Sequence, residues 1–281
     1  MKKTDTLKEI VARKKERLAL AQQAVPVEQL KNTAASMPQA RPFLPAINKP
    51  KTITLIAEIK RQSPSAGVLR EDFSPAQIAS VYQAAGVQAV SVLTEEDFFG
   101  GSLAFINDVK AHTTVPVLRK DFIFEPYQVY ESRAAGADAV LLIADILSKD
   151  ALTELVALAD SLGMGCLVEA HDEKELKKIL SLKIAPCGCA AVKTQSKAKK
   201  TVDFAVGINN RDLHTLEVDA KTTERLYPLV PKDRTVVVES GIRNYQDVLF
   251  FKILGVNACL VGEAIMRGAD MQTTIQDLMG W

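Results

Sequence analysis

Eight short segments rich in Val, Ile and Leu alternate with longer amphipathic segments from about residue 53 to the end of the chain. The pattern predicts strands at 53–60, 88–94, 116–120, 138–143, 165–169, 203–209, 235–239 and 257–261. Helices are expected near 75–85, 103–111, 126–135, 148–162, 173–181, 219–227, 244–254 and 270–279. Because each strand is followed by a helix, the strands must run parallel and be joined by crossovers. The chain is therefore predicted to have an α/β fold.

The number of strand–helix pairs distinguishes two architectures. A doubly wound open sheet is the alternative, but eight pairs without an early glycine-rich dinucleotide motif favour a single (β/α)8 TIM barrel. We expect this barrel over 51–281, after an N-terminal helical extension over 1–50. Apolar spacing in the extension predicts a helix over 4–22, which Val25–Pro26 separates from a short helix at 27–36. The first helix is either a surface helix that caps one barrel end or a lid over the carboxyl ends of the strands.

The charge balance and the apolar runs limit the partners of this chain. The 281 residues include 35 Lys and Arg against 34 Asp and Glu, a formal net charge of +1. That balance argues against a nucleic-acid partner and favours a small-molecule substrate. The N-terminal segment has no apolar core, and no apolar run approaches the ~18 residues of a membrane span. We expect a cytoplasmic protein with no membrane partner, as a monomer or a weak homodimer.

Polar and charged residues recur where the predicted strands end. The active site of a (β/α)8 barrel is built at these carboxyl ends and on the loops that follow them. Side chains alternate between the faces of a strand, so Glu58 and Lys60 share one face, as do Leu118 and Lys120. Ionisable groups at the ends of buried strands are costly unless they are paired or take part in catalysis. The alternative is that some of them are only ion-paired residues of the barrel rim.

The residues around these strand ends form ordered motifs. The first is IAEIKRQSPSAGVL at 56–69, in which AEIK is followed closely by SPS. The others are SVLTEEDFFGGS (91–102), VLRKDFIFEPYQV (117–129), VEAHDEKEL (168–176), GINNRDL (207–213), VVVESGI (236–242) and LVGEAIMR (260–267). Together they resemble the indole-3-glycerol-phosphate synthases of tryptophan biosynthesis, over residues from about 5 to 268. The resemblance implies a monofunctional lyase on a single (β/α)8 barrel, with no cofactor.

The resemblance also implies a reaction, the conversion of 1-(2-carboxyphenylamino)-1-deoxyribulose 5-phosphate to indole-3-glycerol phosphate with loss of carbon dioxide and water. It assigns Lys120 as the general acid beside the ketone. Lys60 is assigned a place near the phosphate and the ketone, and Glu169 acts as a base or acid. Two lysines at one rim would depress each other's pKa unless carboxylates balance their charge. Three carboxylates are placed to do so: Glu58, Glu169 and Glu239. The division of proton transfers among Lys60, Lys120 and Glu169 stays open.

Asn209 and Arg211 lie two residues apart at the end of the sixth predicted strand. Asn209 belongs to the expected catalytic set and should contact substrate hydroxyls or the region of the anthranilate ring. The guanidinium of Arg211 suits a carboxylate, so Arg211 either binds the leaving carboxylate or orders its neighbours. The alternative for Arg211 is a rim ion pair with Asp212 or Glu239.

Phosphate binding is expected at three places. Ser63 presents a hydroxyl from the Ser-Pro-Ser loop. Ser240–Gly241 and Gly262–Glu263 follow the last two strands, where barrels commonly bind phosphate through backbone amides. For Glu263 we expect the amide to bind, because its carboxylate would repel the phosphate. Four apolar side chains are either walls for the anthranilate ring or ordinary core residues: Phe99, Phe122, Leu141 and Leu260.

Residues 182–202 depart from the resemblance, because they form a longer connection than the family usually has. The segment follows a helix and precedes a strand, so we expect it on the face opposite the active site, where it leaves catalysis intact. Its lysines predict a solvated loop, with a binding patch for an acidic partner as the alternative. Cys187 and Cys189 have no further ligands nearby, so no metal site is expected.

Two other functions compete with this interpretation. A different phosphate-sugar barrel enzyme, such as a phosphoribosylanthranilate isomerase, would not need the paired lysines together with AEIK and SPS. A catalytically silent barrel that serves as a binding or scaffold protein would be expected to lack Lys120 or Glu169, and both are present. Three histidines show no ligand spacing and are expected at the periphery: His112, His171 and His214.

Overall fold

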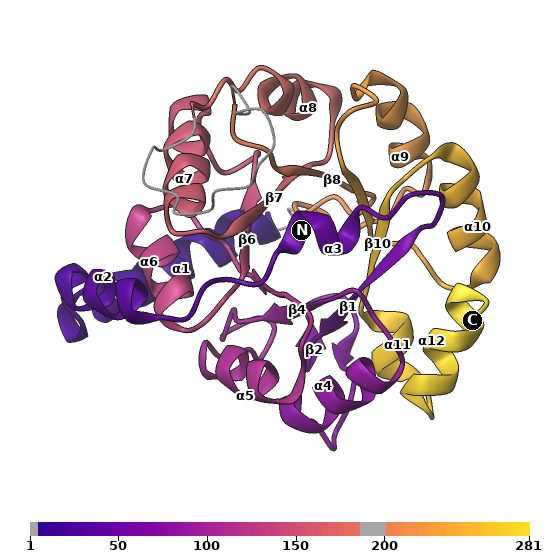
Figure 1. Ribbon diagram of the computed structural model, residues 1–281, viewed down its shortest axis with the longest axis horizontal. Helices are drawn as coiled ribbons and strands as arrows, with labels where there is room; N and C mark the ends of the chain where they lie inside the picture. The colour runs from indigo at the N-terminus through magenta and orange to yellow at the C-terminus, as the bar shows by residue number, and fades with distance from the viewer. Residues whose placement is uncertain (1–4, 186–200) are drawn as a thin grey trace.

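Eight parallel strands close into a barrel, with β1 paired to both β10 and β4 (Figure 1). The computed structural model describes residues 5–185 and 201–281. The strands are β1 (Thr54–Ile59), β4 (Ala89–Leu93), β5 (Val117–Lys120), β6 (Ala139–Ile143), β7 (Gly165–Ala170), β8 (Ala205–Asn209), β9 (Val236–Glu239) and β10 (Ala258–Val261). Because the sheet is closed, the open doubly wound alternative is excluded and the predicted (β/α)8 barrel is confirmed.

Helices form a ring around the strands (Figure 1). They are α4 (Pro75–Ala84), α5 (Ala104–His112), α6 (Pro126–Ala134), α7 (Lys149–Ser161), α8 (Glu173–Leu180), α9 (Lys221–Leu226) with the 3-10 turn η1 (Tyr227–Leu229), α10 (Tyr245–Leu254), α11 (Glu263–Arg267) and α12 (Met271–Met279). Within the described part of the barrel, two elements have no counterpart in the prediction. They are the short α11 and an antiparallel hairpin of β2 (Gln62–Ser63) and β3 (Gly67–Val68), which lies in the loop after β1.

The alternating faces of the strands separate two apolar layers. Inward side chains such as Leu118 and Leu167 fill the barrel, and outward ones such as Val90 pack beneath the helices. Burying one such side chain stabilises the fold by ~1.5–3 kcal/mol. Toward the carboxyl ends the inward positions become charged, because Lys120 follows Leu118 and Glu169 follows Leu167 on the same faces. Apolar side chains therefore fill the barrel up to the carboxyl ends of the strands, where charged side chains take the inward positions.

Three helices precede the barrel: α1 (Thr6–Ala24), α2 (Val27–Ser36) and α3 (Phe43–Ile47). α1 crosses the carboxyl end of the barrel, where Lys14 Nζ lies 2.9 Å from Oδ2 of Asp121, the residue after β5. α3 lies over the centre of the ring in Figure 1 and covers the opposite end, where Phe43 packs closely on Gly165 at the start of β7. Of the two alternatives for the first helix, the structure supports the position over the carboxyl ends.

The segment from 182 to 202 is described only at its two ends. Residues 186–200, with Cys187, Cys189 and the lysines of the predicted loop, lie outside the described residues. The Val202 amide donates a 2.8 Å hydrogen bond to the Ile184 carbonyl. Because Val202 leads into β8, both ends of the segment lie at the amino-terminal end of the barrel. None of the helices in the described ranges is long and apolar enough to cross a membrane.

Candidate active site

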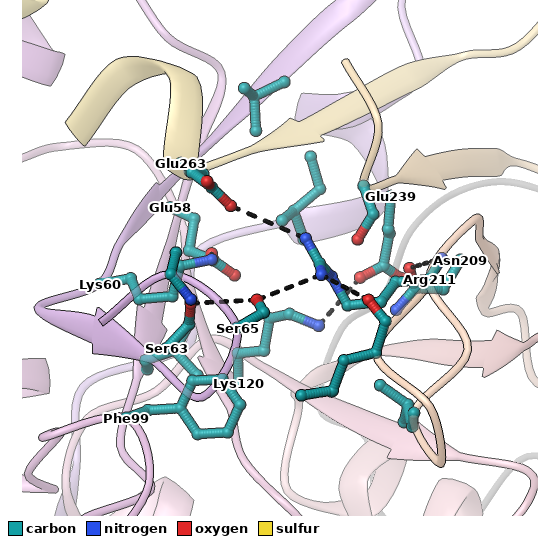
Figure 2. Close-up of a pocket in the computed structure, with 18 of the residues that line it drawn as sticks. Glu58, Lys60, Ser63, Ser65, Phe99, Lys120, Asn209, Arg211, Glu239 and Glu263 are labelled. Carbon is teal, nitrogen blue, oxygen red and sulfur yellow. Dashed lines mark hydrogen bonds and ion pairs between the residues drawn. The ribbon is translucent and has the colours of Figure 1, made fainter. Parts of the chain in front are cut away.

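A pocket of 740 Å³ opens at the carboxyl ends of the strands (Figure 2). All the predicted site residues line it: Glu58, Lys60, Ser63, Phe99, Lys120, Phe122, Leu141, Glu169, Asn209, Arg211, Glu239, Ser240, Gly241, Leu260, Gly262 and Glu263. They come from β1, β5, β6, β7, β8, β9 and β10 and from the loops after these strands or after β4. The fold thus brings residues up to 205 positions apart, Glu58 and Glu263, into one cavity.

Lys120 lies at the floor of the pocket between two buried carboxylates. Its Nζ is 3.3 Å from Glu169 Oε2 and 3.0 Å from Glu239 Oε2. Burial opposes a charge on the ammonium, but the nearby carboxylates outweigh it and raise the pKa of Lys120 above its usual range. A positive charge is therefore fixed at this point of the pocket at neutral pH.

The two carboxylates differ because their remaining contacts differ. Glu169 Oε1 accepts a 3.0 Å hydrogen bond from Asn209 Nδ2 and lies 3.0 Å from His171 Nε2. Burial opposes ionisation of Glu169, but Lys120 and these two side chains hold its pKa below the usual range. Glu239 Oε1 has no hydrogen-bond partner within the described ranges, and burial with the charge of Glu169 raises the pKa of Glu239 to about 8. Of the two carboxylates, Glu169 therefore favours the ionised form and Glu239 the protonated form.

Lys60 and Glu58 form a second ion pair, with 2.7 Å between Nζ and Oε1. Room for Glu58 depends on Gly262, because a Cβ on this glycine would lie 2.4 Å from Glu58 Oε1. Gly207 in β8 similarly makes room for Glu239, whose Oε1 would lie 2.6 Å from an added Cβ. For Gly262 the sequence predicted a close approach to a phosphate. The structure gives a different reason for the glycine, the close approach of the Glu58 carboxylate.

Arg211 reaches across the pocket from the loop after β8 (Figure 2). Its Nη1 donates to Ser65 Oγ at 3.2 Å and to the Leu216 carbonyl at 2.9 Å. Its Nη2 lies 3.7 Å from Glu263 Oε2. Of the acidic residues that the structure describes, Glu263 is the one that pairs with this guanidinium. The predicted alternative, an ion pair of Arg211 with Asp212 or Glu239, is therefore wrong. Arg211 instead links the loops that follow β1, β8 and β10.

The turns after β9 and β10 present backbone to the pocket. Ser240 and Gly241 both have positive φ angles, 64° and 79°. A positive φ is uncommon for serine and typically marks a position under functional constraint. Glu263 opens the short α11, and its Oε1 lies 3.4 Å from Arg267 Nε. Its carboxylate is thus paired with two arginines, which balance its negative charge at the pocket rim.

Apolar side chains form the walls between these polar regions. Phe99 and Phe122 stack in a tilted arrangement with their ring centroids 6.2 Å apart. Leu141 and Leu260 line the pocket and also belong to the apolar filling of the barrel. Both alternatives for these residues therefore apply, because the top of the core is also the wall of the cavity. Ile10 adds a contact from α1, which the sequence analysis did not predict.

Known proteins match this chain along nearly its whole length. The family model for indole-3-glycerol phosphate synthase matches residues 7–190 and 191–278. The chain belongs to this family. An indole-3-glycerol phosphate synthase from Caldanaerobacter subterraneus subsp. tengcongensis is 45% identical over 261 residues, which cover 93% of each chain. Another from Azoarcus sp. (strain BH72) is 44% identical over 282 residues, covering 99% of this chain and 100% of the relative. The resemblance seen in the motifs is therefore confirmed.

Solved structures with low sequence identity share the barrel. The 3-hexulose-6-phosphate synthase from Salmonella typhimurium is similar with a TM-score of 0.58, covering 81% of this chain and 97% of that chain at 13% identity. At this identity the similarity shows the fold alone. The two stretches matched by the indole-3-glycerol phosphate synthase model meet at residues 190 and 191, inside the segment that departs from the family pattern.

The histidine prediction is wrong for one residue. The side chain of His171 is 12% exposed and touches Glu169, so it belongs to the site and not to the periphery. The signal that could have found it is local, because His171 follows Glu169 by two positions and precedes Glu175 by four. His112 is exposed, as predicted, and His214 lies part-exposed between Asp5 and Asp145. Among residues 5–185 and 201–281, no group of three or more His, Cys, Asp or Glu is arranged to hold a metal ion.

Lys14 is a second residue that the sequence analysis missed. It is buried on the inner face of α1, and its Nζ lies 3.1 Å from Glu96 Oε2 and 2.9 Å from Asp121 Oδ2. Arg119 Nη2 approaches the same Asp121 oxygen at 2.8 Å. Lys14 lies four residues after Ile10 on the helix face that packs on the barrel, which is the spacing that could have identified it. It attaches α1 to the residue next to Lys120.

Proposed function

We propose that the protein is an indole-3-glycerol-phosphate synthase, which closes the indole ring of 1-(2-carboxyphenylamino)-1-deoxyribulose 5-phosphate and releases carbon dioxide and water. The observation that carries the proposal is the position of the Lys120 ammonium, 3.3 Å from Glu169 Oε2 and 3.0 Å from Glu239 Oε2 on the pocket floor. Ring closure followed by dehydration needs an acid and a base beside the same carbon. Membership of the family supports this assignment.

In ring closure, the aromatic carbon that bears the carboxylate bonds to the ketone carbon. Lys120 donates a proton to the ketone oxygen as this bond forms, so the oxygen becomes a hydroxyl. Carbon dioxide then leaves, and the electrons of its bond restore the aromatic ring. A fixed ammonium is suited to this step, because it neutralises the charge that develops on the oxygen.

Dehydration removes the hydroxyl as water together with one proton from the new ring. We assign Glu169 as the base. Once Lys120 has given up its proton, the charge that lowers the pKa of Glu169 is gone, so the carboxylate becomes a stronger base at the moment it is needed. Lys60 is a second acid within the pocket for the departing hydroxyl, and Asn209 holds Glu169 in place. Glu58 holds the Lys60 side chain in position through their 2.7 Å ion pair.

The two charged ends of the substrate are assigned to different regions. Arg211 is suited to the anthranilate carboxylate, since its guanidinium offers a planar set of donors. The phosphate is assigned to Ser63, Lys60 and the backbone amides of Ser240–Gly241 and Gly262–Glu263. The ring lies between the two phenylalanines and the two leucines of the pocket walls.

A direct assay tests the activity. Purified protein is incubated with the carboxyphenylamino-deoxyribulose phosphate, and indole fluorescence is recorded. Lys120→Met keeps the length of the side chain without its charge and is expected to lower kcat by about 10²–10⁴-fold, with little change in substrate binding. Lys252→Met, on the exposed face of α10, is the matched control. No product from folded wild-type protein would overturn the function, and near-normal turnover in Lys120→Met would remove Lys120 from the acid role.

We further propose that residues 1–50 form an extension packed on a barrel of residues 51–281, and that the protein acts in the cytoplasm without a nucleic-acid partner. The nearly balanced charge supports the last point. The expected state in solution is a monomer or a weak homodimer. Light scattering after size-exclusion chromatography measures this directly, and a stable assembly larger than a dimer would contradict it.

A further inference from the structure

A histidine lies between two carboxylates at the edge of the pocket floor. His171 Nε2 is 3.0 Å from Glu169 Oε1, and His171 Nδ1 is 3.0 Å from Glu175 Oε2. The side chains of His171 and Glu175 are 12% and 11% exposed, and that of Glu169 is 1% exposed. The three groups therefore form a nearly buried chain from the catalytic carboxylate to the first turn of α8.

The start of α8 fixes this chain through local contacts. Asp172 is the N-cap, and its Oδ1 accepts a 2.8 Å hydrogen bond from the Glu175 amide. Glu175 Oε2 also accepts a 2.9 Å hydrogen bond from the backbone amide of His171. Glu175 is thus held by the helix cap and in turn holds both the backbone and the ring of His171. The imidazole has little freedom to turn away from Glu169.

The two carboxylates, each 3.0 Å from a ring nitrogen, favour the charged form of the imidazole. Burial disfavours the charge, but the hydrogen bonds and charges of Glu169 and Glu175 outweigh it and raise the pKa of His171 to about 10. The other ionisable groups that face Glu169 are Lys120 from β5 and Glu239 from β9. Both of these approach from the pocket side, and among the residues that the structure describes it is His171 that adds a positive charge from the α8 side.

The two oxygens of Glu169 are consequently not equivalent. Oε1 accepts the hydrogen bond from Asn209 and lies 3.0 Å from His171 Nε2 in an ion pair, whereas the ion pair of Oε2 within the described ranges is with Lys120. We propose that His171, held by Glu175, is a positioning residue that occupies Oε1 of Glu169 and leaves Oε2 as the oxygen that takes the substrate proton. The inference rests on the proposed role of Glu169 as the base. It assigns a task in catalysis to His171 and Glu175, which do not line the pocket.

Three variants separate positioning from simple stability. His171→Leu removes both ring nitrogens and the charge, whereas His171→Gln keeps a polar amide near the position of Nε2 and loses the charge. Glu175→Gln keeps the histidine but weakens its support. We expect His171→Leu to lower kcat by about 10–100-fold with KM changed by less than about threefold. His171→Gln should recover most of the loss, and Glu175→Gln should fall between His171→Leu and the wild type.

The pH profile of kcat is the second readout. In His171→Leu the acidic limb should move to higher pH, because the burial of Glu169 raises its pKa and one of the opposing charges is gone. His112→Gln, on the exposed end of α5, is the matched control and should leave the limb in place. Two results for folded His171→Leu would overturn the inference. One is an acidic limb of the pH profile and a kcat that both equal those of the wild type. The other is a rise in KM by the same factor by which kcat falls.

Failure of this inference is distinguishable from failure of the proposed function. If wild-type protein forms no product, the function itself is wrong. If Glu169→Gln keeps normal turnover, the assignment of the base is wrong. If Glu169→Gln is inactive and the His171 variants behave as wild type, only the positioning role is wrong. Should His171→Leu fail to fold, Glu175→Gln and His171→Gln carry the same comparison, and wild-type kinetics in both would overturn it.

Discussion

Replacing Gly262 with alanine should damage the pocket through one defined contact. The added Cβ would lie 2.4 Å from Oε1 and 3.0 Å from Cβ of Glu58. Gly262 has a negative φ of −125°, so the replacement meets no left-handed backbone penalty and the contact itself is the source of strain. To reach an ordinary contact, the carboxylate must move by about 1 Å, which is enough to break its 2.7 Å ion pair with Lys60.

The expected costs follow from that displacement. Overpacking of a buried site of this kind destabilises a protein by about 1–3 kcal/mol. For a chain of this length the melting temperature should fall by about 2–6 °C. A misplacement of about 1 Å in a catalytic group typically costs about 10²-fold, so we expect kcat/KM to drop by about that factor. Thermal melts and the indole fluorescence assay measure the two effects separately.

A double-mutant cycle identifies the contact. In a Glu58→Ala background the shortest clash is removed and only a Cβ–Cβ contact remains, so Gly262→Ala should lower the melting temperature by less than half as much. An equal loss of melting temperature in both backgrounds would refute the reasoning, because the strain would then come from the backbone. Wild-type stability and activity in Gly262→Ala would refute it as well.

Three further perturbations test other parts of the molecule. Lys14→Met leaves Asp121 buried without one of its cations and should cost about 3 kcal/mol, measured by urea unfolding; a loss below about 0.5 kcal/mol would show that Lys14 does not anchor α1. Replacing 186–200 by a short Gly-Ser linker should leave kcat unchanged, because the flanking ends meet at the barrel end opposite the pocket, and a collapse of kcat in folded protein would contradict this placement. His214 has a raised pKa, because its two carboxylate partners outweigh burial. Its stabilisation is therefore complete below the ordinary pKa of about 6.5 and is lost as pH rises through the folded pKa. The melting-temperature gap between wild type and His214→Gln should accordingly be widest in mild acid and narrow at alkaline pH, and a gap that widens with pH would show the opposite linkage.

Much of the fold and the location of the site could be predicted because they depend on local patterns. Period-two alternation placed Leu118 inside the barrel and Lys120 above it, and the end of each strand marked the catalytic face. The same patterns could not predict α3, because a five-residue helix contains too little periodicity to recognise. They also could not choose between the two positions of α1, since an amphipathic face does not say which end of a barrel it covers.

The proton states of the site depend on contacts between distant residues. Glu169 and Glu239 lie near the carboxyl ends of two equivalent strands, and the strand pattern alone does not say which of them ionises more readily. They differ because Glu169 meets Asn209 and His171, whereas Glu239 Oε1 meets no described hydrogen-bond partner. The sequence by itself therefore determined the strands, their inward faces and the set of residues at the pocket. Only the tertiary structure decided which carboxylate is ionised, because pKa depends on burial and on charges that approach through space.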